Sequence, residues 1–353
     1  MELKSLTNRS ATFWRRVVQV GFAVLTVALG CLFIRFVDQA QARVAITQTR
    51  PPGVEAFLPI SGMLGLRHWV ESGTLNTIHP ASVVLFLAIV ATAFLARKAF
   101  CSWVCPVGTL SEGLALLGAR LIGRNYLLPR WLDVPLRAVK YAFLAFFLWI
   151  AAVIPSAALG PFLYGDYHRV ADVKTYLFFA DITPIALQVV VGLLIGSLFV
   201  RGLWCRYLCP YGALLGLVGW LSPARIRRDP ESCSGCESCT AACPQRLPVH
   251  TSLTVASVEC TACHTCVDAC PKAQTLTFAV GRRRVAPWVV AGVLVSIFVV
   301  AVGGARLAGR WQSSVPPEEY AARILTIDQV SHDHPGRLAV ADPPAMQGPR
   351  SGE

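Results

Sequence analysis

The sequence predicts the fold class of an all-α membrane protein. This protein would have about five transmembrane helices and one small, cysteine-rich inserted domain. Of its 353 residues, 54% are hydrophobic and only 15% are charged, whereas soluble domains carry about a quarter of charged residues. Two dense cysteine runs lie between the last two apolar stretches. The net charge of +12 is concentrated beside the apolar stretches. This distribution is typical of residues that orient a membrane protein, and it favours no nucleic-acid partner.

The inserted domain is predicted over residues 223–280. One cysteine run begins at Cys233 and reads C-S-G-C-E-S-C-T-A-A-C-P, and the other begins at Cys260 and reads C-T-A-C-H-T-C-V-D-A-C-P. Both have the spacing C-x2-C-x2-C-x3-C-P of bacterial ferredoxins, which hold iron–sulfur clusters through cysteine thiolates. We therefore expect a bacterial-type ferredoxin domain with two [4Fe–4S] clusters.

Each cluster is predicted to take ligands from both runs. In two-cluster ferredoxins the fourth cysteine of each run binds the cluster of the other run. Pro244 and Pro271 then turn the chain away from the clusters. The first cluster is accordingly assigned to Cys233, Cys236, Cys239 and Cys270, and the second to Cys260, Cys263, Cys266 and Cys243.

Two other interpretations fit these runs less well. A zinc site prefers separated pairs of ligands to four cysteines in one short run, and a set of disulfides would leave the ferredoxin spacing unexplained. Cys260, Cys263 and His264 form a C-x2-C-H sequence, which is the attachment motif of haem c. The ferredoxin run already needs both cysteines, so His264 is interpreted as a spacer residue.

Five apolar stretches are predicted to cross the membrane, whose apolar core is about 30 Å thick. The first, Val17–Phe36, is followed by a sequence similar to a signal-peptide cleavage site at Gln39–Ala42. Its apolar run is longer than an ordinary signal core, which favours an uncleaved helix. Cys31 within it is interpreted as a small core residue. The remaining stretches are Pro80–Ala96, Tyr141–Leu159 and Pro184–Val200, which complete a four-helix membrane domain over 17–222, and Pro287–Val302, the core of a fifth helix over 287–303.

The distribution of Lys and Arg predicts the orientation in the membrane. The segments 1–16, 97–140 and 201–286 are rich in basic residues, and short loops of this kind stay in the cytoplasm. The N-terminus and the ferredoxin domain are therefore predicted to be cytoplasmic. The tail, residues 304–353, is predicted to lie outside and to be partly disordered. The expected location is the inner membrane of a bacterium.

An internal repeat connects the membrane domain to a second set of cysteines. Residues 97–108 and 201–212 both read R-x-x-[F/W]-C-x3-C-P-x-G, and each is followed by an apolar helix that ends near 122 or 221. Both copies follow an inward-running helix. Two copies that run the same way are related by an axis along the membrane normal, so we expect the two motifs to meet.

The four cysteines of the repeat are candidates for a further metal or redox site. Residues four apart are neighbours on a helix, and four sulfurs would suffice for one more iron–sulfur cluster. Helix N-termini and nearby basic side chains are expected to lower the thiol pKa values. Redox-active dithiols, with or without copper, and ordinary structural cysteines are the alternatives. The residues concerned are Cys101, Cys105, Cys205 and Cys209.

These motifs together resemble the polyferredoxin-like membrane proteins over residues 50–275, including the phrase His79-Pro80 before a span. That family includes the membrane subunit of the quinol dehydrogenase that serves periplasmic nitrate reductase, the membrane part of the nitrous-oxide reductase maturation protein, and an accessory ferredoxin of cytochrome oxidase. The chain lacks the flavin domain of the second and the C-terminal β-domain of the third. Its fifth span and long tail differ from the usual ending of the first.

The resemblance implies an electron relay between the quinone pool and a periplasmic or soluble redox partner, as in an oxidoreductase subunit of quinol dehydrogenase type. Three histidines predicted on the outer side are candidate proton acceptors for quinol. Three aromatic residues beside the cysteine pairs are interpreted as interfacial residues. The histidines are His68, His79 and His168, and the aromatic residues are Trp103, Trp204 and Tyr207.

A second hypothesis belongs to a different class of function. The protein would be an assembly factor that uses its clusters to reduce copper or thiols for another respiratory metalloenzyme. Such a factor is expected to carry a motif that captures the metal. The sequence His332-Asp333-His334 in the tail is a weak candidate. An oxygen sensor would need a coupled effector domain, and the sequence shows no such domain.

Overall fold

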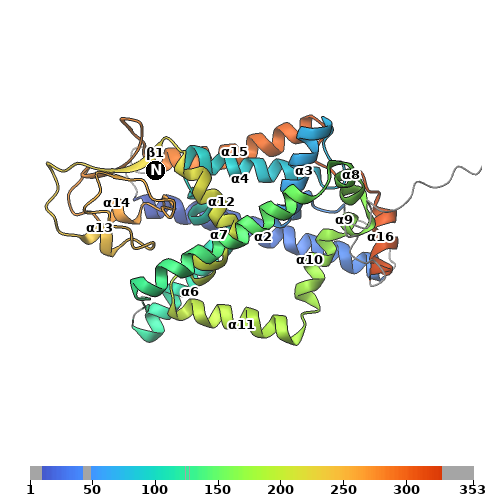
Figure 1. Cartoon of the computed structure of the whole chain (residues 1–353), viewed down its shortest axis with the longest axis horizontal. Coiled ribbons are helices and arrows are strands. Elements are labelled where there is room, and N and C mark those ends of the chain that lie inside the picture. The colour runs from blue at the N-terminus through green and yellow to red at the C-terminus, as the bar shows by residue number, and fades with distance from the viewer. Residues whose placement is uncertain (1–9, 43–48, 124, 127, 328–353) are drawn as a thin grey trace, which may run out of the picture.

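The computed structural model describes residues 10–42, 49–123, 125–126 and 128–327. The candidate motif His332-Asp333-His334 lies outside the described residues. The molecule is elongated, with a small β-containing domain at one end of its long axis and helices over the rest (Figure 1). Helix α16 (Pro317–Leu325) lies at the opposite end from the small domain.

Helix α2 (Ala11–Gln41) begins beside the small domain and extends along the molecule (Figure 1). The Ser10 hydroxyl caps its N-terminus by accepting from the Phe13 amide at 3.2 Å. The amides of Ala11 and Thr12 donate to the Asp268 carboxylate at 3.1 and 2.7 Å. The N-terminal helix and the small domain are therefore attached to each other. Cys31 is exposed on this helix, so its interpretation as a core residue was wrong.

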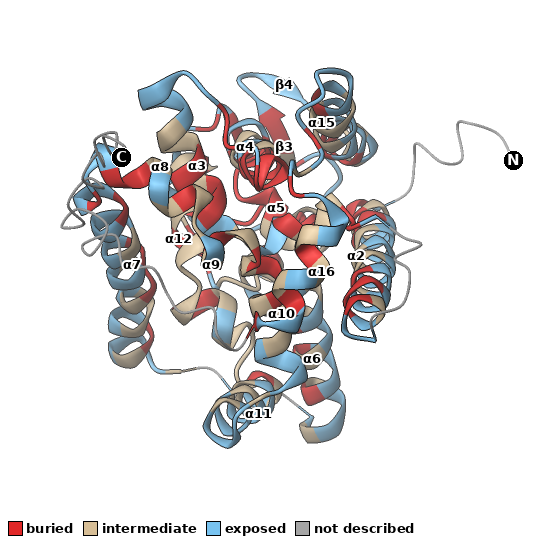
Figure 2. Cartoon of the chain, turned by 90° about the vertical axis from the view of Figure 1, so that its right-hand side faces the viewer, coloured by how far each residue is buried: buried red, intermediate tan, exposed pale blue. Residues whose placement is uncertain are grey.

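Helix α4 (Pro80–Ala96) is central to the helical part (Figure 2). It packs against α3 (Pro59–Ser72), α12 (Pro210–Trp220) and α15 (Pro287–Leu307). A helix that is apolar on all sides belongs in the middle of a bundle. Its apolar residues are accordingly buried over most of the helix, as shown in red in Figure 2.

The peripheral helices expose apolar side chains. Helices α2, α7 (Arg130–Val153), α11 (Pro184–Phe199) and α15 present mainly exposed residues on their outer faces (Figure 2). The exposed side chains include Val24, Trp149, Ile185 and Val300. Contiguous apolar surface of this kind marks an interaction with another apolar phase, which for four helices around one core is the lipid of a membrane.

Three helices, α2, α7 and α15, are long and apolar enough to cross a membrane. A fourth span results if α10 (Ala171–Ala180) and α11 are counted together, although the chain bends by 78° between them. Helix α4 has 17 residues, which gives a length of about 25 Å. The prediction of a membrane protein with several spans therefore holds, while the count of five remains a prediction.

The third predicted span differs in its bounds from the helix that forms. Helix α7 begins at Arg130 and ends at Val153, and α8 (Ser156–Tyr164) follows as a separate helix. The break occurs at Pro155, because proline has no amide to donate and its ring blocks the preceding turn. The apolar run continues across this break, so hydropathy alone does not reveal the break.

The small domain contains one antiparallel sheet of order β2-β1-β3-β4. Ile226 pairs with Phe278 and with Val255 in the register, and all three side chains are buried. One short helix lies within each cysteine run. The strands are β1 (Ala224–Arg228), β2 (Thr254–Val255), β3 (Leu276–Val280) and β4 (Arg283–Arg284), and the helices are α13 (Ser238–Ala241) and α14 (Thr265–Asp268).

Part of the predicted tail is an ordered helix. Helix α16 packs against α2 through Tyr320 and Ile324, both of which are buried. It also carries Arg323, which pairs with Asp166 at 2.7 Å. Residues 328–353 lie outside the described residues, so the predicted disorder of the tail end stays a prediction.

Candidate functional site

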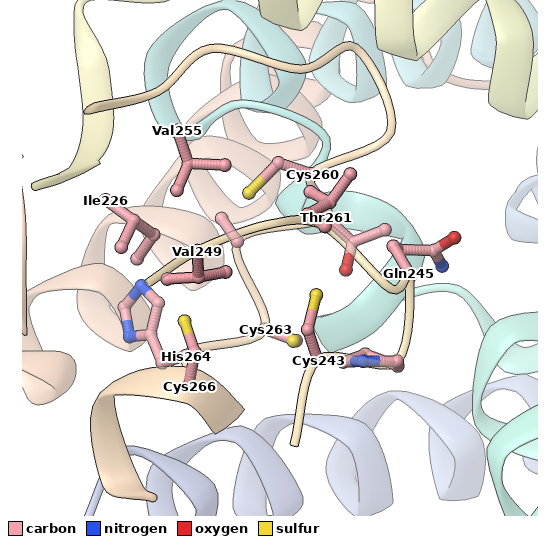
Figure 3. A pocket seen from close by; sticks show the side chains of 13 residues that line it. Ile226, Cys243, Gln245, Val249, Val255, Cys260, Thr261, Cys263, His264 and Cys266 are labelled. Carbon is pink, nitrogen blue, oxygen red and sulfur yellow. The ribbon is translucent and has the colours of Figure 1, made fainter. Parts of the chain in front are cut away.

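One cavity in the small domain is lined by the four cysteines that were assigned to the second cluster. Their sulfur atoms point toward one another, and apolar side chains such as Ile226 close the cavity (Figure 3). Three of the four cysteines are at least nine-tenths buried. The cysteines are Cys243, Cys260, Cys263 and Cys266.

The backbone around this cavity is shaped by left-handed residues. Ala262 has φ 47° and His264 has φ 61°, values that a non-glycine residue adopts only under local constraint. They turn the chain within the C-x2-C-x2-C segment so that one loop presents three thiols to one centre. Burial raises the pKa of Cys260 to about 11, although Arg97 opposes the shift. A metal centre that binds here must therefore displace thiol protons.

A second cavity is lined by the four cysteines that were assigned to the first cluster, together with Arg228 and Lys272. This cavity is much closer to solvent, since Cys236 is exposed. Backbone and side-chain hydrogen bonds lower the thiol pKa values of Cys233 and Cys236. The cysteines are Cys233, Cys236, Cys239 and Cys270.

Each cavity thus takes three cysteines from one run and the fourth from the other run. Four thiols around a closed cavity fit a cubic iron–sulfur cluster, which needs a thiolate at each iron. The residues therefore fit the two clusters that the spacing predicts. None of the thirteen cysteines, all of which the structure describes, forms a disulfide. Among the described residues, no three Cys, His, Asp or Glu side chains are grouped closely enough to bind a single metal ion.

The two C-x3-C-P motifs have nearly the same local structure. Cys105 and Cys209 are the N-cap residues of α6 (Pro106–Ile122) and α12, and each of these helices begins with proline. Proline suits the first helical position, where its missing amide would have no partner. The Gly212 amide donates to the Cys209 sulfur at 3.3 Å. The first cysteine of each pair lies one short helix earlier, on α5 (Ala99–Trp103) or on the short π-helix η2 (Trp204–Leu208).

The four cysteines of the repeat line one large cavity of about 1120 Å³, which we name the membrane cavity. The expected lowering of their pKa values was wrong for three of them. Burial raises the pKa of Cys101 and Cys105, and it raises that of Cys205 to about 12. Lys98 opposes the shift at Cys101 and Cys205, but desolvation is the larger effect.

The first motif is attached to the loop of the second cluster. The Ser102 hydroxyl donates to the Thr261 carbonyl at 2.7 Å, and the Trp103 indole donates to the Ala262 carbonyl at 3.0 Å. The Trp103 ring also lies edge-on to His264, with 5.6 Å between ring centroids. Trp103 is completely buried, so its interpretation as an interfacial residue was wrong.

The second motif is attached to the segment that follows Cys243. Arg206 donates to the Gln245 side chain at 3.2 Å and to the Asp133 carboxylate at 2.9 and 3.0 Å. Tyr207 donates to the same carboxylate at 2.6 Å and is buried, so it too is a structural residue rather than an interfacial one. Trp204 is 38% exposed, as an interfacial aromatic residue would be.

The membrane cavity and the cavity of the second cluster share lining residues. Cys263 and Thr261 line both cavities, and so do Pro244 and Gln245. The paired cysteines therefore lie next to the second cluster site, and the first cluster site lies farther out toward solvent. Sequence reasoning could not order the three groups, because every contact between them joins distant segments.

Buried charges also join the small domain to the helices. Arg97 donates to the carbonyls of Val255 and Ser257 at 2.7 and 2.6 Å. Lys140 is completely buried and binds Glu259 through both carboxylate oxygens, at 2.7 and 2.6 Å. Burial disfavours ionised Glu259, but Lys98 and Lys140 outweigh that effect and lower its pKa. Sequence reasoning missed this pair, since a single acid before a cysteine carries no signal of its own.

Two of the three histidines predicted on the outer side, His79 and His168, form part of a buried network. His79 is completely buried and lies 3.2 Å from Glu55 and 2.7 Å from the His168 carbonyl. Burial lowers the pKa of His168 to about 3. Arg50 binds both Glu55 and Asp172 in the same network. Two of the three predicted proton acceptors are thus enclosed by protein, while His68 lies on α3 outside this network.

Comparison with known proteins agrees with this geometry. A family model described as a 4Fe-4S binding domain matches residues 78–125 and again 182–229, and one described as a 4Fe-4S dicluster domain matches residues 225–271. The chain is 42% identical over 334 residues to YccM of Escherichia coli (strain K12), which is named as an electron transport protein. That match covers 92% of this chain and 93% of YccM. The chain belongs to the polyferredoxin-like 4Fe-4S membrane protein family.

Other relatives of this polyferredoxin-like protein support the same family assignment. It is 29% identical over 244 residues to the ferredoxin-type protein NapH of Haemophilus influenzae. That match covers 67% of this chain and 77% of NapH. It is 28% identical over 272 residues to the regulatory protein NosR of Pseudomonas aeruginosa. That match covers 69% of this chain and 36% of NosR. No solved structure matches the chain. The predicted family is confirmed, and the polyferredoxin-like chain is a membrane iron–sulfur electron-transfer protein.

Proposed function

We propose that this protein carries electrons between membrane quinol and a redox partner through three cysteine-held centres. Two are [4Fe–4S] clusters in the small domain, and the third is an iron–sulfur or other metal centre at the paired cysteines. When bound, such centres supply one-electron transfer chemistry. The observation that carries the proposal is the shared lining of the membrane cavity and the second cluster cavity, which includes Cys263 itself.

The geometry supports one order of the three cysteine groups. The paired cysteines line a cavity between apolar helices, where a lipid-soluble substrate has access. The second cluster site is buried next to them, and the first cluster site opens to solvent near Cys236. Electrons from quinol would therefore enter at the pairs and leave from the first cluster site to a soluble or subunit partner.

The proposed roles of the protein are to hold and orient these centres. Trp103 and Ser102 fix the loop of the second cluster against the first cysteine pair. Arg206 fixes the segment after Cys243 against the second pair. The two repeats thus hold the two ligand-bearing segments of one cluster site. In this role the chain is an oxidoreductase subunit of quinol dehydrogenase type.

We also propose five spans in a bacterial inner membrane, with the N-terminus and the small domain in the cytoplasm. The attachment of Ala11 and Thr12 to Asp268 supports a common side for the N-terminus and the small domain. The position of α16 at the other end of the molecule supports a location outside for the tail (Figure 1). The excess of basic residues in the small domain supports its cytoplasmic side.

The iron content tests the number of centres. Anaerobically purified protein is expected to contain about twelve irons and about as much acid-labile sulfide per chain, since each cubic cluster holds four of each. Changing the four paired cysteines to serine is expected to leave about eight irons and the spectra of the two ferredoxin-type clusters. The measurements are iron and sulfide analysis with EPR of the reduced state.

Other results of the iron analysis would contradict particular parts of the proposal. About eight irons in both proteins would contradict a third iron–sulfur centre and would favour thiol or copper chemistry at the pairs, as in the assembly-factor hypothesis. Fewer than about four irons in the intact protein would contradict the two-cluster assignment. A serine variant that also loses the ferredoxin-type spectra would show instead that the pairs are needed for folding.

A further inference from the structure

The membrane cavity has polar groups at two ends and apolar walls between them. One end includes Arg50 and Asp172, and the other includes the paired cysteines, Arg15 and Glu112. The wall between them comes largely from α2, including Leu25 and Leu29. A large apolar cavity with a few polar groups at its ends suits an amphiphile with a polar ring and a hydrocarbon tail.

The outer end has one buried donor without a partner, the Trp311 indole nitrogen, but it lies far from the paired cysteines. Arg50 is paired with both Glu55 and Asp172, and Tyr320 donates to Asp172. The donors of this network are already used within it. The outer network also adjoins the start of α4, whereas the paired cysteines follow its end. Since α4 has 17 residues, the two ends are about 25 Å apart, which places the outer end far from any electron acceptor.

The cysteine end lies beside the electron acceptor and also carries a carboxylate. Glu112 accepts from Arg15 at 2.8 and 3.0 Å and from Gln19 at 3.0 Å. The same Gln19 amide donates to the Ser102 carbonyl at 2.9 Å, directly after Cys101 in the chain. Glu112 is thus connected to the first cysteine pair through one side-chain nitrogen.

Two polar atoms at this end have no hydrogen-bond partner. The Nε of Arg15 and the hydroxyl of Ser111 are buried and unpaired, and both residues line the membrane cavity. Arg15 and Ser111 are 5% and 8% exposed. The Ser111 hydroxyl lies beside the thiol of Cys205 without good hydrogen-bond geometry. Buried unpaired donors are costly, so they mark a place where a ligand oxygen fits.

We propose that the quinol ring binds at the cysteine end of the membrane cavity and that Glu112 accepts its protons. This proposal rests on the quinol relay proposed above. The quinol hydroxyl would donate to Glu112, whose oxygens can each accept more than one hydrogen bond and so keep Arg15 and Gln19 bound. The other ring oxygen would accept from Ser111 or Arg15, and the tail would lie along α2.

Oxidation of quinol at this site conserves protons and electrons. One quinol loses two protons and two electrons and becomes quinone. A metal centre held by the paired cysteines would accept the two electrons one at a time, and the second cluster site adjoins it. The two protons pass one after the other to Glu112 and then to water, because the Glu112 side chain is 25% exposed. Proton release is thus placed on the side of the small domain.

Binding tests the location without any turnover. Decylubiquinone is titrated into the purified full-length protein in detergent, and its Kd is measured by calorimetry. Leu25→Trp fills the cavity and is expected to weaken binding about tenfold or more, as loss of a ligand's apolar contacts does. Val24→Trp is the matched control, because Val24 is exposed on α2 as Leu25 is but does not line the cavity, and the Kd of this variant is expected to change less than about twofold.

The role of Glu112 has a separate readout. Glu112→Gln is expected to keep the Kd within about threefold but to slow bleaching of the iron–sulfur absorption by decylubiquinol roughly a hundredfold, the usual contribution of a proton acceptor. Glu112→Asp is expected to recover part of that rate. Reduction by dithionite is expected to be the same in all variants, which shows that the centres are intact.

The possible failures can be told apart. Equal Kd values for Leu25→Trp and Val24→Trp would overturn the location while leaving the relay in place. A normal bleaching rate in Glu112→Gln would overturn the proton role. If intact protein with its full iron content is bleached by dithionite but never by quinol, the quinol relay itself is wrong.

Discussion

At the scale of single residues, the two copies of the repeat differ in how closely the chain approaches itself. Gly108 and Gly212 hold the same position in the motif C-x3-C-P-x-G. A Cβ atom on Gly108 would lie 2.1 Å from the Cys101 carbonyl oxygen, whereas one on Gly212 would meet the Cys209 sulfur at an ordinary 3.6 Å. Only the first copy therefore depends on glycine for close contact between its two cysteine segments.

This difference predicts the outcome of one matched pair of variants. Gly108→Ala is expected to push Cys101 away from Cys105 and to destabilise the protein by about 2 kcal/mol, a typical cost of overpacking. Gly212→Ala is expected to be close to neutral. The measurements are iron per chain and thermal unfolding in detergent. Equal losses in both variants would mean that the two copies are equally tight, contrary to the structure.

At the scale of secondary-structure elements, the small domain is held to the helices by buried ion pairs. Lys140 on α7 binds Glu259, which directly precedes Cys260. Asp133 on the same helix binds Arg206 of η2. Removing one member of a buried pair leaves the other charge without compensation. Helix α7 thus positions both the second cysteine pair and the loop of the second cluster.

Glu259→Gln is therefore expected to be strongly destabilising. The loss should be about 3 kcal/mol or more, because Lys140 would be left in a buried site without its counter-charge. The control is Glu71→Gln, which breaks the exposed Arg67–Glu71 pair on α3 and should cost little stability, because water screens an exposed ion pair. Thermal unfolding in detergent compares the two. Similar losses in the two variants would contradict a positioning role for the buried pair.

At the scale of the whole molecule, the three cysteine groups lie in order from the membrane cavity to the solvent-exposed end of the small domain. The attachment of α2 to Asp268 puts the start of α2 at that same end, and α16 lies at the opposite end (Figure 1). An odd number of spans follows from this arrangement if the membrane lies between the two ends.

The arrangement predicts the topology of the chain in the cell. Alkaline phosphatase joined after Ile327 is expected to be active, since the enzyme folds only outside the cytoplasm, whereas a fusion after Val280 is expected to be inactive. A green fluorescent protein fusion at each position should give the opposite result. Activity on the same side for both positions would contradict the proposed fifth span, α15.

Local patterns in the sequence were sufficient for the iron–sulfur family and the membrane class of this protein. The ferredoxin spacing grouped the eight cysteines into two sets: three cysteines of each set are close in the chain, so one loop can wrap around one centre, and the fourth followed from the pattern of two-cluster ferredoxins. The apolar helix predicted after each C-x3-C-P motif forms as α6 or α12, and each of these helices begins at the proline of its motif. Hydropathy identified the membrane class, because it depends only on composition within a stretch.

The tertiary structure alone decided how these parts work together. Trp103 meets Ala262 across 159 residues of sequence, and Lys140 meets Glu259 across 119. No local pattern specifies such contacts, because their energy depends on packing between distant segments. For the same reason the order of the cysteine groups, the membrane cavity and the link from Glu112 through Gln19 to Ser102 became visible only once the helices were assembled. Sequence determined the metal ligands that are available, and the fold determined which of them are neighbours.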